Sequence, residues 1–322
     1  MKLAHAFRYA LLLSVISGIA SAQSYPQKPI RLIVTFAAGG GADFMGRLVG
    51  QKLDEAWRQP VIIDNRAGAN GAIGNEAVAK AAPDGYTLLL GAAGPLTIAP
   101  VLYPKLPFDT VRDFAPVSLL AHSSFALVVH PSIPARTPKE LIALARAKPG
   151  KLNLGSSGTG GSPHLAGELF KNLAKIDIVH VPYKGLAPAI TDLIAGQIDL
   201  IFADLNLVQQ QVQAGKLRAL AITGAQRSTI MPELPTVAET VLPGYQAGTW
   251  YGVLAPAGTP RDIVVKLNTE INRILATDEM RQRLATQGAE RAPGTPEQFA
   301  AFIRAELDKW VKVVRAADLR ID

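Results

Sequence analysis

The feature that most constrains the fold of this chain is a repeated alternation of short apolar runs with segments of helical spacing. Residues 30–36, 87–90 and 198–202 are runs of mainly branched apolar residues, and a helical pattern follows each of them. Such an alternation is typical of parallel sheets with crossover helices, so the sequence predicts an α/β protein. The chain has 322 residues, which is enough for two units of this kind.

Further strands and helices fit the same scheme. Additional strands are predicted at residues 61–63, 117–121, 125–130, 151–155, 178–181, 217–223 and 250–255. Four helices are predicted to begin where a hydroxyl residue precedes proline, because hydroxyls cap helices and proline suits the first helical position. These starts are Thr137-Pro138, Ser162-Pro163, Thr259-Pro260 and Thr295-Pro296. Residues 296–316 repeat apolar side chains at helical spacing and predict a long amphipathic helix.

The order of these elements predicts two lobes. Residues 125–245 contain a complete α/β set of their own, and the strand at 250–255 can rejoin the first set. We therefore expect lobe 1 to comprise residues 23–124 plus 246–322 and lobe 2 to comprise residues 125–245. Two crossing strands then join the lobes, with a cleft between them.

The N-terminus predicts export. Lys2 and Arg8 precede and flank an apolar run at residues 10–20, and Ala20-Ser21-Ala22 offers small residues for cleavage. The run is shorter than the ~20 residues that a membrane span needs, which favours a signal peptide over a membrane anchor or a buried helix. We expect residues 1–22 to be removed after Ala22 and the mature protein to lie in the periplasm. The chain has no cysteine, which excludes disulfides and thiol catalysis.

Two glycine-rich segments are the candidate functional elements. Each follows a predicted strand and opens a helix, where backbone N–H groups and the helix N-terminus favour an anionic oxygen. The first segment supplies the candidate residues Phe36, Ala38, Gly39, Gly40, Gly41, Ala42 and Asp43. Asp43 is expected to cap the helix or to fix the loop by accepting backbone N–H bonds.

The second segment adds short hydroxyl donors to the same arrangement. It supplies the candidate residues Ser156, Ser157, Thr159, Gly160, Ser162 and His164. One such loop in each lobe suits a clamp for an anion, although each can also be an ordinary strand-to-helix turn. Gly91 and Ala92, which follow the strand at 87–90, and Asp204 complete the expected ligand-binding set.

Several other functions lack their sequence signals. Neither loop matches G-x-G-x-x-G or a phosphate-binding loop that ends in Gly-Lys-Ser/Thr, and no G-x-S-x-G or H-E-x-x-H occurs. His164 and Glu168 are a pair of possible metal ligands, fewer than the three or four of a zinc site. The formal net charge is +7, but the basic residues are scattered. We therefore expect no metal, no cofactor and no nucleic-acid partner.

The chain also resembles a known family in many separate blocks. These are residues 25–31 (YPQKPIR), the first glycine loop with Asp43 and Arg47, and residues 64–69 (DNRAGA), 82–87 (APDGYT), 164–168 (HLAGE), 180–185 (HVPYKG), 215–218 (GKLR) and 254–260 (LAPAGTP). On these blocks the chain resembles the Bug family, also called the tripartite tricarboxylate transporter receptor family.

The resemblance implies a periplasmic binding protein of the Venus flytrap type, with two α/β lobes joined by crossing strands. It implies that the two loops grip one carboxylate of a small solute, which the protein captures for uptake or sensing and does not convert. An inner-membrane transporter or a sensor is the implied partner, and a monomer is expected. A secreted α/β hydrolase and a phosphate or sulfate binder are the alternatives.

The chain departs from the family pattern at three places. Ala37-Ala38 stands where prolines are frequent, and Ser162-Pro163 stands where serines are usual. Phe202-Ala203-Asp204 replaces a common Phe-Asp-Asn, which moves the acid by one position. An acid at the far end of the cleft repels a second carboxylate and suits an ammonium or a hydroxyl group.

Overall fold

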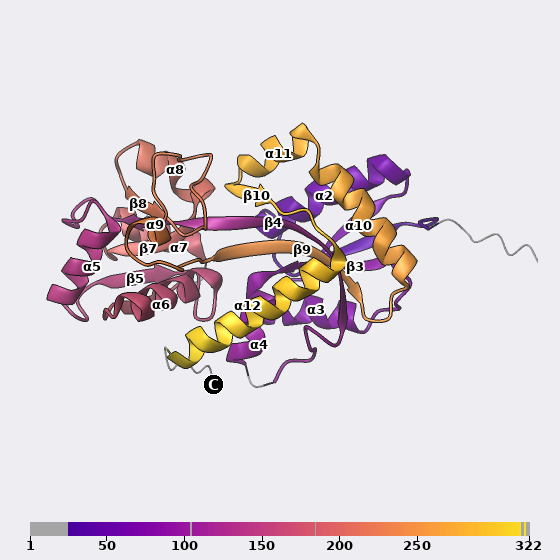
Figure 1. Ribbon diagram of the computed structural model, residues 1–322, viewed down its shortest axis with the longest axis horizontal. Helices are drawn as coiled ribbons and strands as arrows, with labels where there is room; N and C mark the ends of the chain where they lie inside the picture. The colour runs from indigo at the N-terminus through magenta and orange to yellow at the C-terminus, as the bar shows by residue number, and fades with distance from the viewer. Residues whose placement is uncertain (1–24, 104, 184, 317–318, 320–322) are drawn as a thin grey trace, which may run out of the picture.

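The structure, a computed structural model, describes residues 25–103, 105–183, 185–316 and 319. The expected signal peptide at 1–22 lies outside the described residues. The fold consists of two α/β lobes joined by long strands that run through the middle of the molecule (Figure 1). No helix in the described part of the chain combines the length and apolar composition that a membrane span requires.

Lobe 1 is built on a mixed sheet. Its strands are β1 (Ile30–Val34), β2 (Val61–Asn65), β3 (Thr87–Ala92), β9 (Gly248–Pro256), β10 (Ala289–Arg291) and the first part of β4 (Phe114–Val129), in the order β2-β1-β3-β9-β4 with β10 beside β4. Strands β1, β2 and β3 are parallel, and β9 runs antiparallel to β3 and β4. The helical elements are α2 (Gly41–Trp57), η2 (Ala69–Gly71), α3 (Ala72–Ala79), η3 (Gly94–Ile98), α4 (Ala99–Leu102), α10 (Arg261–Leu275), α11 (Asp278–Ala285) and α12 (Pro296–Ala316).

Lobe 2 repeats the scheme with a second sheet. Strands β6 (Val179–Pro182), β5 (Asn153–Ser156) and β7 (Leu200–Asp204) are parallel, and the second part of β4 pairs with β7 and with β8 (Arg218–Ile222). The helices are α5 (Pro138–Ala147), α6 (Ser162–Ala174), α7 (Leu186–Ile194), α8 (Leu205–Gln213) and α9 (Val237–Thr240). Both sheets are covered on two faces by apolar clusters, which explains the nearly continuous apolar strands of the sequence.

The crossing strand β4 corrects one prediction. The two strands predicted at 117–121 and 125–130 form a single 16-residue strand, Phe114–Val129. Its residues up to Ser124 pair with β9, and those from Phe125 onward pair with β7. The gap between the two predicted strands, His122-Ser123-Ser124, is extended backbone at the passage between the lobes. The division of the lobes at 124/125 and 245/246 stays a prediction.

The predicted helix starts divide into two groups. Thr137 and Thr295 accept the backbone N–H of Glu140 and Gln298, as expected of caps. Ser162 is instead the first residue of α6, whose N-cap is Gly161, and the Thr259 hydroxyl donates to the Pro256 carbonyl. These two hydroxyls are therefore free of the capping role, because each helix begins one residue away from the predicted position.

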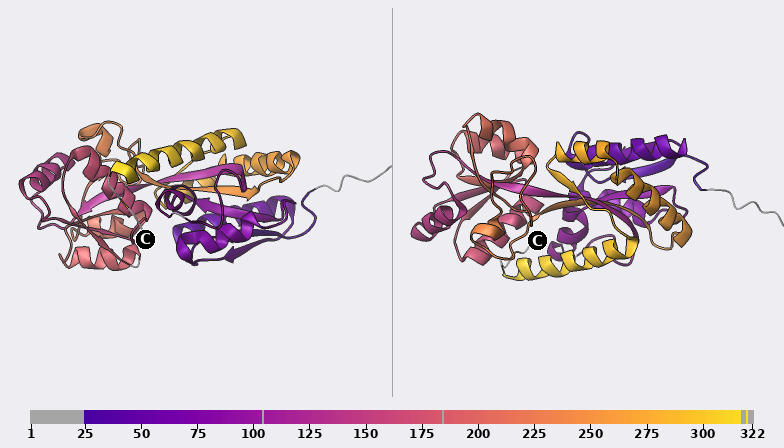
Figure 2. Two further views of the ribbon diagram at one scale, coloured as in Figure 1. Left: turned by 90° about the horizontal axis from the view of Figure 1, so that it is seen from below. Right: turned by 45° about the horizontal axis from the view of Figure 1, so that its top comes forward.

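Helix α12 spans the residues predicted for it and contacts both lobes. It crosses the front of the molecule in Figure 1 and lies along one edge of it in both views of Figure 2. Its buried Trp310 and Val313 share an apolar cluster with Ile98 of η3 and with Leu165 of α6. One long amphipathic face therefore ties the two lobes together outside the strands.

Candidate ligand-binding site

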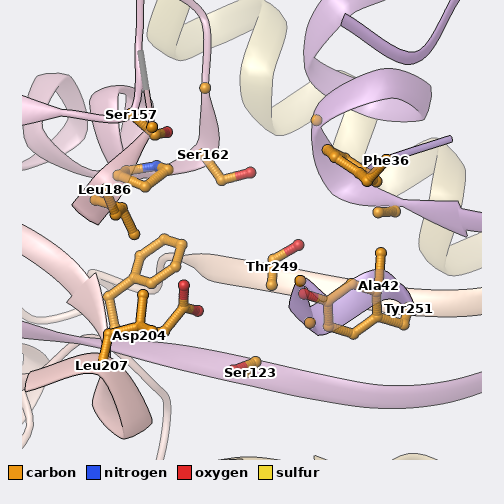
Figure 3. Close-up of a pocket in the computed structure, with 18 of the residues that line it drawn as sticks. Phe36, Ala42, Ser123, Ser157, Ser162, Leu186, Asp204, Leu207, Thr249 and Tyr251 are labelled. Carbon is orange, nitrogen blue, oxygen red and sulfur yellow. The ribbon is translucent and has the colours of Figure 1, made fainter. Parts of the chain in front are cut away.

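A cavity of about 730 Å³ lies between the lobes, a volume that suits a small metabolite. Its walls come from residues 36–43, which we call loop 1, and residues 156–162, which we call loop 2. The crossing strands β4 and β9 form the floor, and the starts of α7 and α8 close the side of lobe 2 (Figure 3). Each lobe thus contributes one glycine-rich loop to the same space.

Loop 1 is held from behind by the carboxylate of Asp43. This side chain is buried, and its Oδ2 accepts the backbone N–H of Gly39 at 2.9 Å and Nε of Arg47 at 2.9 Å. The Asn65 amide donates to Asp43 Oδ1 at 3.0 Å and to the Phe36 carbonyl. Burial alone raises the pKa of Asp43, but these hydrogen bonds outweigh it and lower the pKa below its usual value. The carboxylate is therefore ionised and fixes the loop, which is one of the two roles predicted for it.

The face of loop 1 that meets the cavity offers backbone groups. Gly39 has a φ of +90°, a conformation that favours glycine, and Gly40 is the N-cap of α2 with no side chain capping it. The first N–H groups of a helix have no partner within the helix, so an uncapped start points free donors at the cavity. The N-terminal end of α2 therefore suits an anionic oxygen.

Loop 2 is held by neutral groups instead. Ser156 is fully buried, its Oγ lies 2.7 Å from Nε2 of His180, and it accepts the Gly158 N–H at 3.1 Å. The His180 ring stacks on His164 with ring centroids 3.7 Å apart, and His164 Nδ1 accepts the Gly160 N–H. Burial and the nearby His164 lower the pKa of His180 to about 4. His164 thus acts as an acceptor that holds the loop, whereas the sequence analysis placed it in the expected ligand-binding set.

Six hydroxyl groups face the cavity from both sides. Loop 2 supplies Ser157, Thr159 and Ser162, β4 supplies Ser123, and β9 supplies Thr249 and Tyr251. Figure 3 shows the labelled members of this set around one space. Hydrogen bonds among the described residues involve none of these hydroxyl oxygens, while buried serines such as Ser156 are paired. These hydroxyls are therefore available to a bound solute or to water.

The charge in the cavity is unusual for an anion site. Among the described residues that line it, none is Lys, Arg or His, and the single acid is Asp204. Burial raises the pKa of Asp204 to about 6. The starts of α2, α6, α7 and α8 all meet the cavity, and each lacks a side-chain cap. Helix dipoles and neutral hydroxyls therefore supply the positive potential.

The structure brings together ten of the sixteen predicted site residues. Those lining the cavity are Phe36, Gly39, Gly40, Gly41, Ala42, Ala92, Ser157, Thr159, Ser162 and Asp204. The other six lie outside its lining: Ala38, Asp43, Gly91, Ser156, Gly160 and His164. Asp43, Ser156 and His164 are turned inward, where they hold the loops. Gly91 faces Leu96 and Leu254 in the core, because successive strand residues point to opposite faces.

Sequence reasoning missed the floor of the cavity. Ser123 and Phe125 alternate on β4, and Thr249 and Tyr251 alternate on β9, with Ser123 directly opposite Thr249. The strand at 250–255 was predicted to cross between the lobes, but its sequence does not indicate which of its residues face the cleft. Leu186, Asn206, Leu207 and Gln287 come from helix starts and a loop that only the tertiary fold brings there. In the described residues, no group of three acids and histidines lies together as a metal site requires.

Comparison with known proteins agrees with this geometry. The family description "Tripartite tricarboxylate transporter family receptor" matches residues 45–319. The protein BugT of Bordetella pertussis is 38% identical over 307 residues, which cover 95% of this chain and 94% of BugT.

Two solved structures of Rhodopseudomonas palustris proteins are also similar. Rpa4515 with adipate has a TM-score of 0.83 and 37% identity, and the match covers 92% of this chain and 99% of Rpa4515. MatC with bound malate has a TM-score of 0.76 and 33% identity, with 90% of this chain and 100% of MatC covered. The chain belongs to the tripartite tricarboxylate transporter receptor family, whose members are periplasmic solute-binding proteins.

Proposed function

We propose that this protein captures a small carboxylic acid in the cavity between its lobes and delivers it unchanged to an inner-membrane transporter or a sensor. The observation that carries the proposal is the set of unpaired hydroxyls and uncapped helix starts that converge from both lobes. The similar proteins Rpa4515 and MatC were solved with adipate and malate, which are both carboxylates and support the same solute class.

The proposed binding mode places one carboxylate between loop 1 and loop 2. Backbone N–H groups at the start of α2 approach it from lobe 1, and the hydroxyls of Ser157 and Ser162 approach it from lobe 2. Hydrogen bonds to a charged group contribute about 1.5–3 kcal/mol each, so a few of them account for useful affinity. Closure of the lobes on the solute follows from this arrangement, because each lobe holds only half of the donors.

A direct test compares acids with their uncharged amides. Thermal unfolding of the mature protein is followed with hexanoate, adipate, hexanamide, sulfate and phosphate, since a ligand that binds the folded state raises its stability. Calorimetry then measures Kd for each compound that shifts the transition. We expect the carboxylates to bind and hexanamide not to bind. Binding of sulfate or phosphate in place of the carboxylates would support an oxyanion receptor instead.

The hydrolase alternative has one observation in its favour. Ser156 Oγ lies 2.7 Å from His180 Nε2, which is the spacing of a nucleophile and its base. The side chain of Ser156 is fully buried and lies outside the cavity lining, so a substrate in the cavity does not reach it. We expect no turnover of short-chain p-nitrophenyl esters. Turnover that Ser156→Ala abolishes would show an enzyme.

The proposal includes export and a monomeric state. The N-terminal segment predicts cleavage after Ala22 and residence in the periplasm. N-terminal sequencing of protein from the periplasmic fraction is expected to begin at Gln23, and light scattering is expected to give the mass of one chain. A periplasmic product that retains Met1 would contradict the cleavage.

A further inference from the structure

Asp204 is the one ionisable acid in the described lining of the cavity, and it has no protein partner there. It ends β7 and occupies the N-cap position of α8, but its side chain makes no capping hydrogen bond. In Figure 3 its carboxylate points into the cavity, toward the side of Thr249. Asp204 pairs with Phe125 across the sheet, so both side chains face the cavity. The acid is therefore aimed at whatever the cavity holds.

Among the described residues that line the cavity with Asp204, none is a cation that compensates its charge. Phe125, Leu186 and Leu207 supply apolar contacts on the lobe 2 side of the cavity. Among the described lining residues, the hydroxyl of Tyr251 is the other ionisable group. Burial and the charge of Asp204 both raise the pKa of Tyr251, so the two groups lie within electrostatic reach and the phenol stays neutral. A solute in the cavity therefore meets a carboxylate on one side and donors on the other.

The two ends of the cavity consequently favour different chemical groups. Loops 1 and 2 offer the donors of two helix starts, those of α2 and α6, and the hydroxyls of Ser157, Thr159 and Ser162, which suit a carboxylate. Asp204 offers acceptors in a partly desolvated position, where a second carboxylate meets a like charge that water screens poorly. A hydroxyl or ammonium group at that point instead donates a charge-assisted hydrogen bond, one of the stronger kinds.

We propose that Asp204 makes this receptor selective for monocarboxylic acids whose far end carries a hydrogen-bond donor, and makes it discriminate against dicarboxylates. The inference rests on the proposed function, because it assumes that one carboxylate occupies the loops. It distinguishes this chain from a general dicarboxylate receptor by a single side chain in the cavity.

A series of acids with equal chain length isolates the far end. Calorimetric Kd values are measured at pH 7.5 for hexanoate, 6-hydroxyhexanoate, 6-aminohexanoate and adipate, and for the four-carbon set butyrate, 4-hydroxybutyrate, 4-aminobutyrate and succinate. In the wild type, we expect the best donor-bearing acid to bind about tenfold or more tightly than the diacid of equal length, since one charged hydrogen bond corresponds to about that factor.

Asp204→Asn tests the side chain itself, because it keeps the shape and removes the charge. This variant is expected to bind the diacid about tenfold more tightly than the wild type does and to lose most of its preference for the ammonium end. Asp54→Asn is the matched control, since Asp54 is exposed on α2 and lies outside the cavity lining. It removes the same charge and is expected to leave every Kd unchanged.

Two kinds of result overturn the inference, and they differ in what they leave standing. If the wild type binds the diacids as tightly as the donor-bearing acids, or if Asp204→Asn shifts all acids equally, the selectivity is wrong while carboxylate capture stands. If none of the eight acids binds, the proposed carboxylate function itself is contradicted, and the inference falls with it.

Discussion

Loop 1 and loop 2 occupy equivalent places in the two lobes, yet they are built from different chemistry. Both follow a parallel strand, and both open a helix whose N-cap is a glycine without side-chain capping. Loop 1 presents no hydroxyl and is held by an ionised carboxylate, Asp43. Loop 2 presents Ser157, Thr159 and Ser162 and is held by Ser156 and two stacked imidazoles.

The two loops differ in the groups that hold their backbones, but they are alike in the neutral donors that they offer to a solute. Both loops aim neutral donors at the cavity, so the same anion suits both. The charge in loop 1 is turned away from the cavity, where it fixes backbone groups at Gly39 and Phe36 through Asp43 and Asn65. A solute receptor can therefore use a charged side chain to hold a binding loop while only neutral groups of that loop face the solute.

The largest effect is expected from blocking the backbone face of loop 1. Gly40 has an extended conformation with a φ of −89°, and an added Cβ meets no protein atom closer than 3.9 Å. Gly40→Val therefore fits the fold but fills solute space, and we expect affinity to fall by about 100-fold, which is ~3 kcal/mol. Calorimetry with the tightest acid measures this change.

Ala38→Val is the matched control for Gly40→Val. Ala38 belongs to the same loop and is exposed, but it lies outside the cavity lining. An unchanged Kd is expected for Ala38→Val. Equal losses in the two variants would show that loop 1 responds to any added bulk and does not contact the solute through Gly40.

The side chain that holds loop 1, Asp43, is expected to contribute more to the free energy of unfolding than the side chain that holds loop 2, Ser156. Asp43→Ala leaves the Gly39 N–H and the Asn65 amide without their buried acceptor, so the free energy of unfolding is expected to fall by about 2–3 kcal/mol. Ser156→Ala removes a neutral acceptor and is expected to cost about 1–2 kcal/mol. Urea denaturation measures both changes.

Arg47→Ala serves as the control for the loop 1 support. Arg47 is more than half exposed, and its removal leaves Asp43 with its other two donors. An exposed ion pair contributes at most about 1 kcal/mol, so the loss is expected to stay below that. A loss as large as that of Asp43→Ala would mean that the ion pair and not the backbone bond holds the loop.

Deleting one hydroxyl tests the donors that loop 2 alone possesses. Ser157 lines the cavity and its hydroxyl has no hydrogen-bond partner among the described residues, so Ser157→Ala is expected to remove a solute contact and no support. We expect Kd to rise by about tenfold, the lower end for a hydrogen bond to a charged group, with stability unchanged. An unaltered Kd would place the carboxylate away from loop 2.

The smallest change in stability is expected from pH. The pKa of His180 is about 4 in the folded protein and about 6.5 when unfolded, so the unfolded state binds more protons between these values. The contribution of His180 to stability therefore falls as pH drops from 6.5 to 4, by about 1 kcal/mol after allowance for the partial exposure of the ring. Asp204, whose pKa is raised to about 6, contributes in the opposite direction over this range, so the His180 contribution has to be isolated by a variant. The pKa of Asp43 is lowered, so its carboxylate stays ionised in this range.

Comparison of wild type with His180→Gln isolates this contribution. Urea denaturation at several pH values between 4 and 6.5 is expected to show a shallower pH dependence in the variant. If the free energy of unfolding depends on pH equally in both proteins, a neutral His180 does not hold loop 2. That result would say nothing against the role of Asp43 in loop 1.

The sequence predicted the parts of the fold and of the site that depend on local patterns. Apolar runs and helix starts located most elements, and loops of glycine next to hydroxyls located Gly40, Ser157 and Ser162. Local patterns did not predict which side chains of a strand face the cavity and which face the core, because this depends on how the strand is placed in the sheet. Trp250 packs on Phe299 in the core, while its neighbours Thr249 and Tyr251 line the cavity.

Contacts between distant residues limited the prediction further. His164 and His180 belong to α6 and β6, and nothing in their spacing indicates that their rings stack. The sequence therefore assigned His164 to the solute, whereas the structure gives it to Gly160. Polar residues in a glycine loop can face the solute or support the backbone, and only the fold separates the two roles.

The salt dependence of Kd tests the central claim most directly, namely that neutral donors in both loops hold the carboxylate. Calorimetry with the tightest acid is carried out at ionic strengths from low salt to ~0.5 M, where the Debye length falls to only a few ångströms. The account predicts that Kd changes by less than about threefold, because hydrogen bonds from neutral groups inside a closed cavity are screened little. A steep loss of affinity with rising salt would contradict it and reveal a lysine or arginine that pairs with the solute.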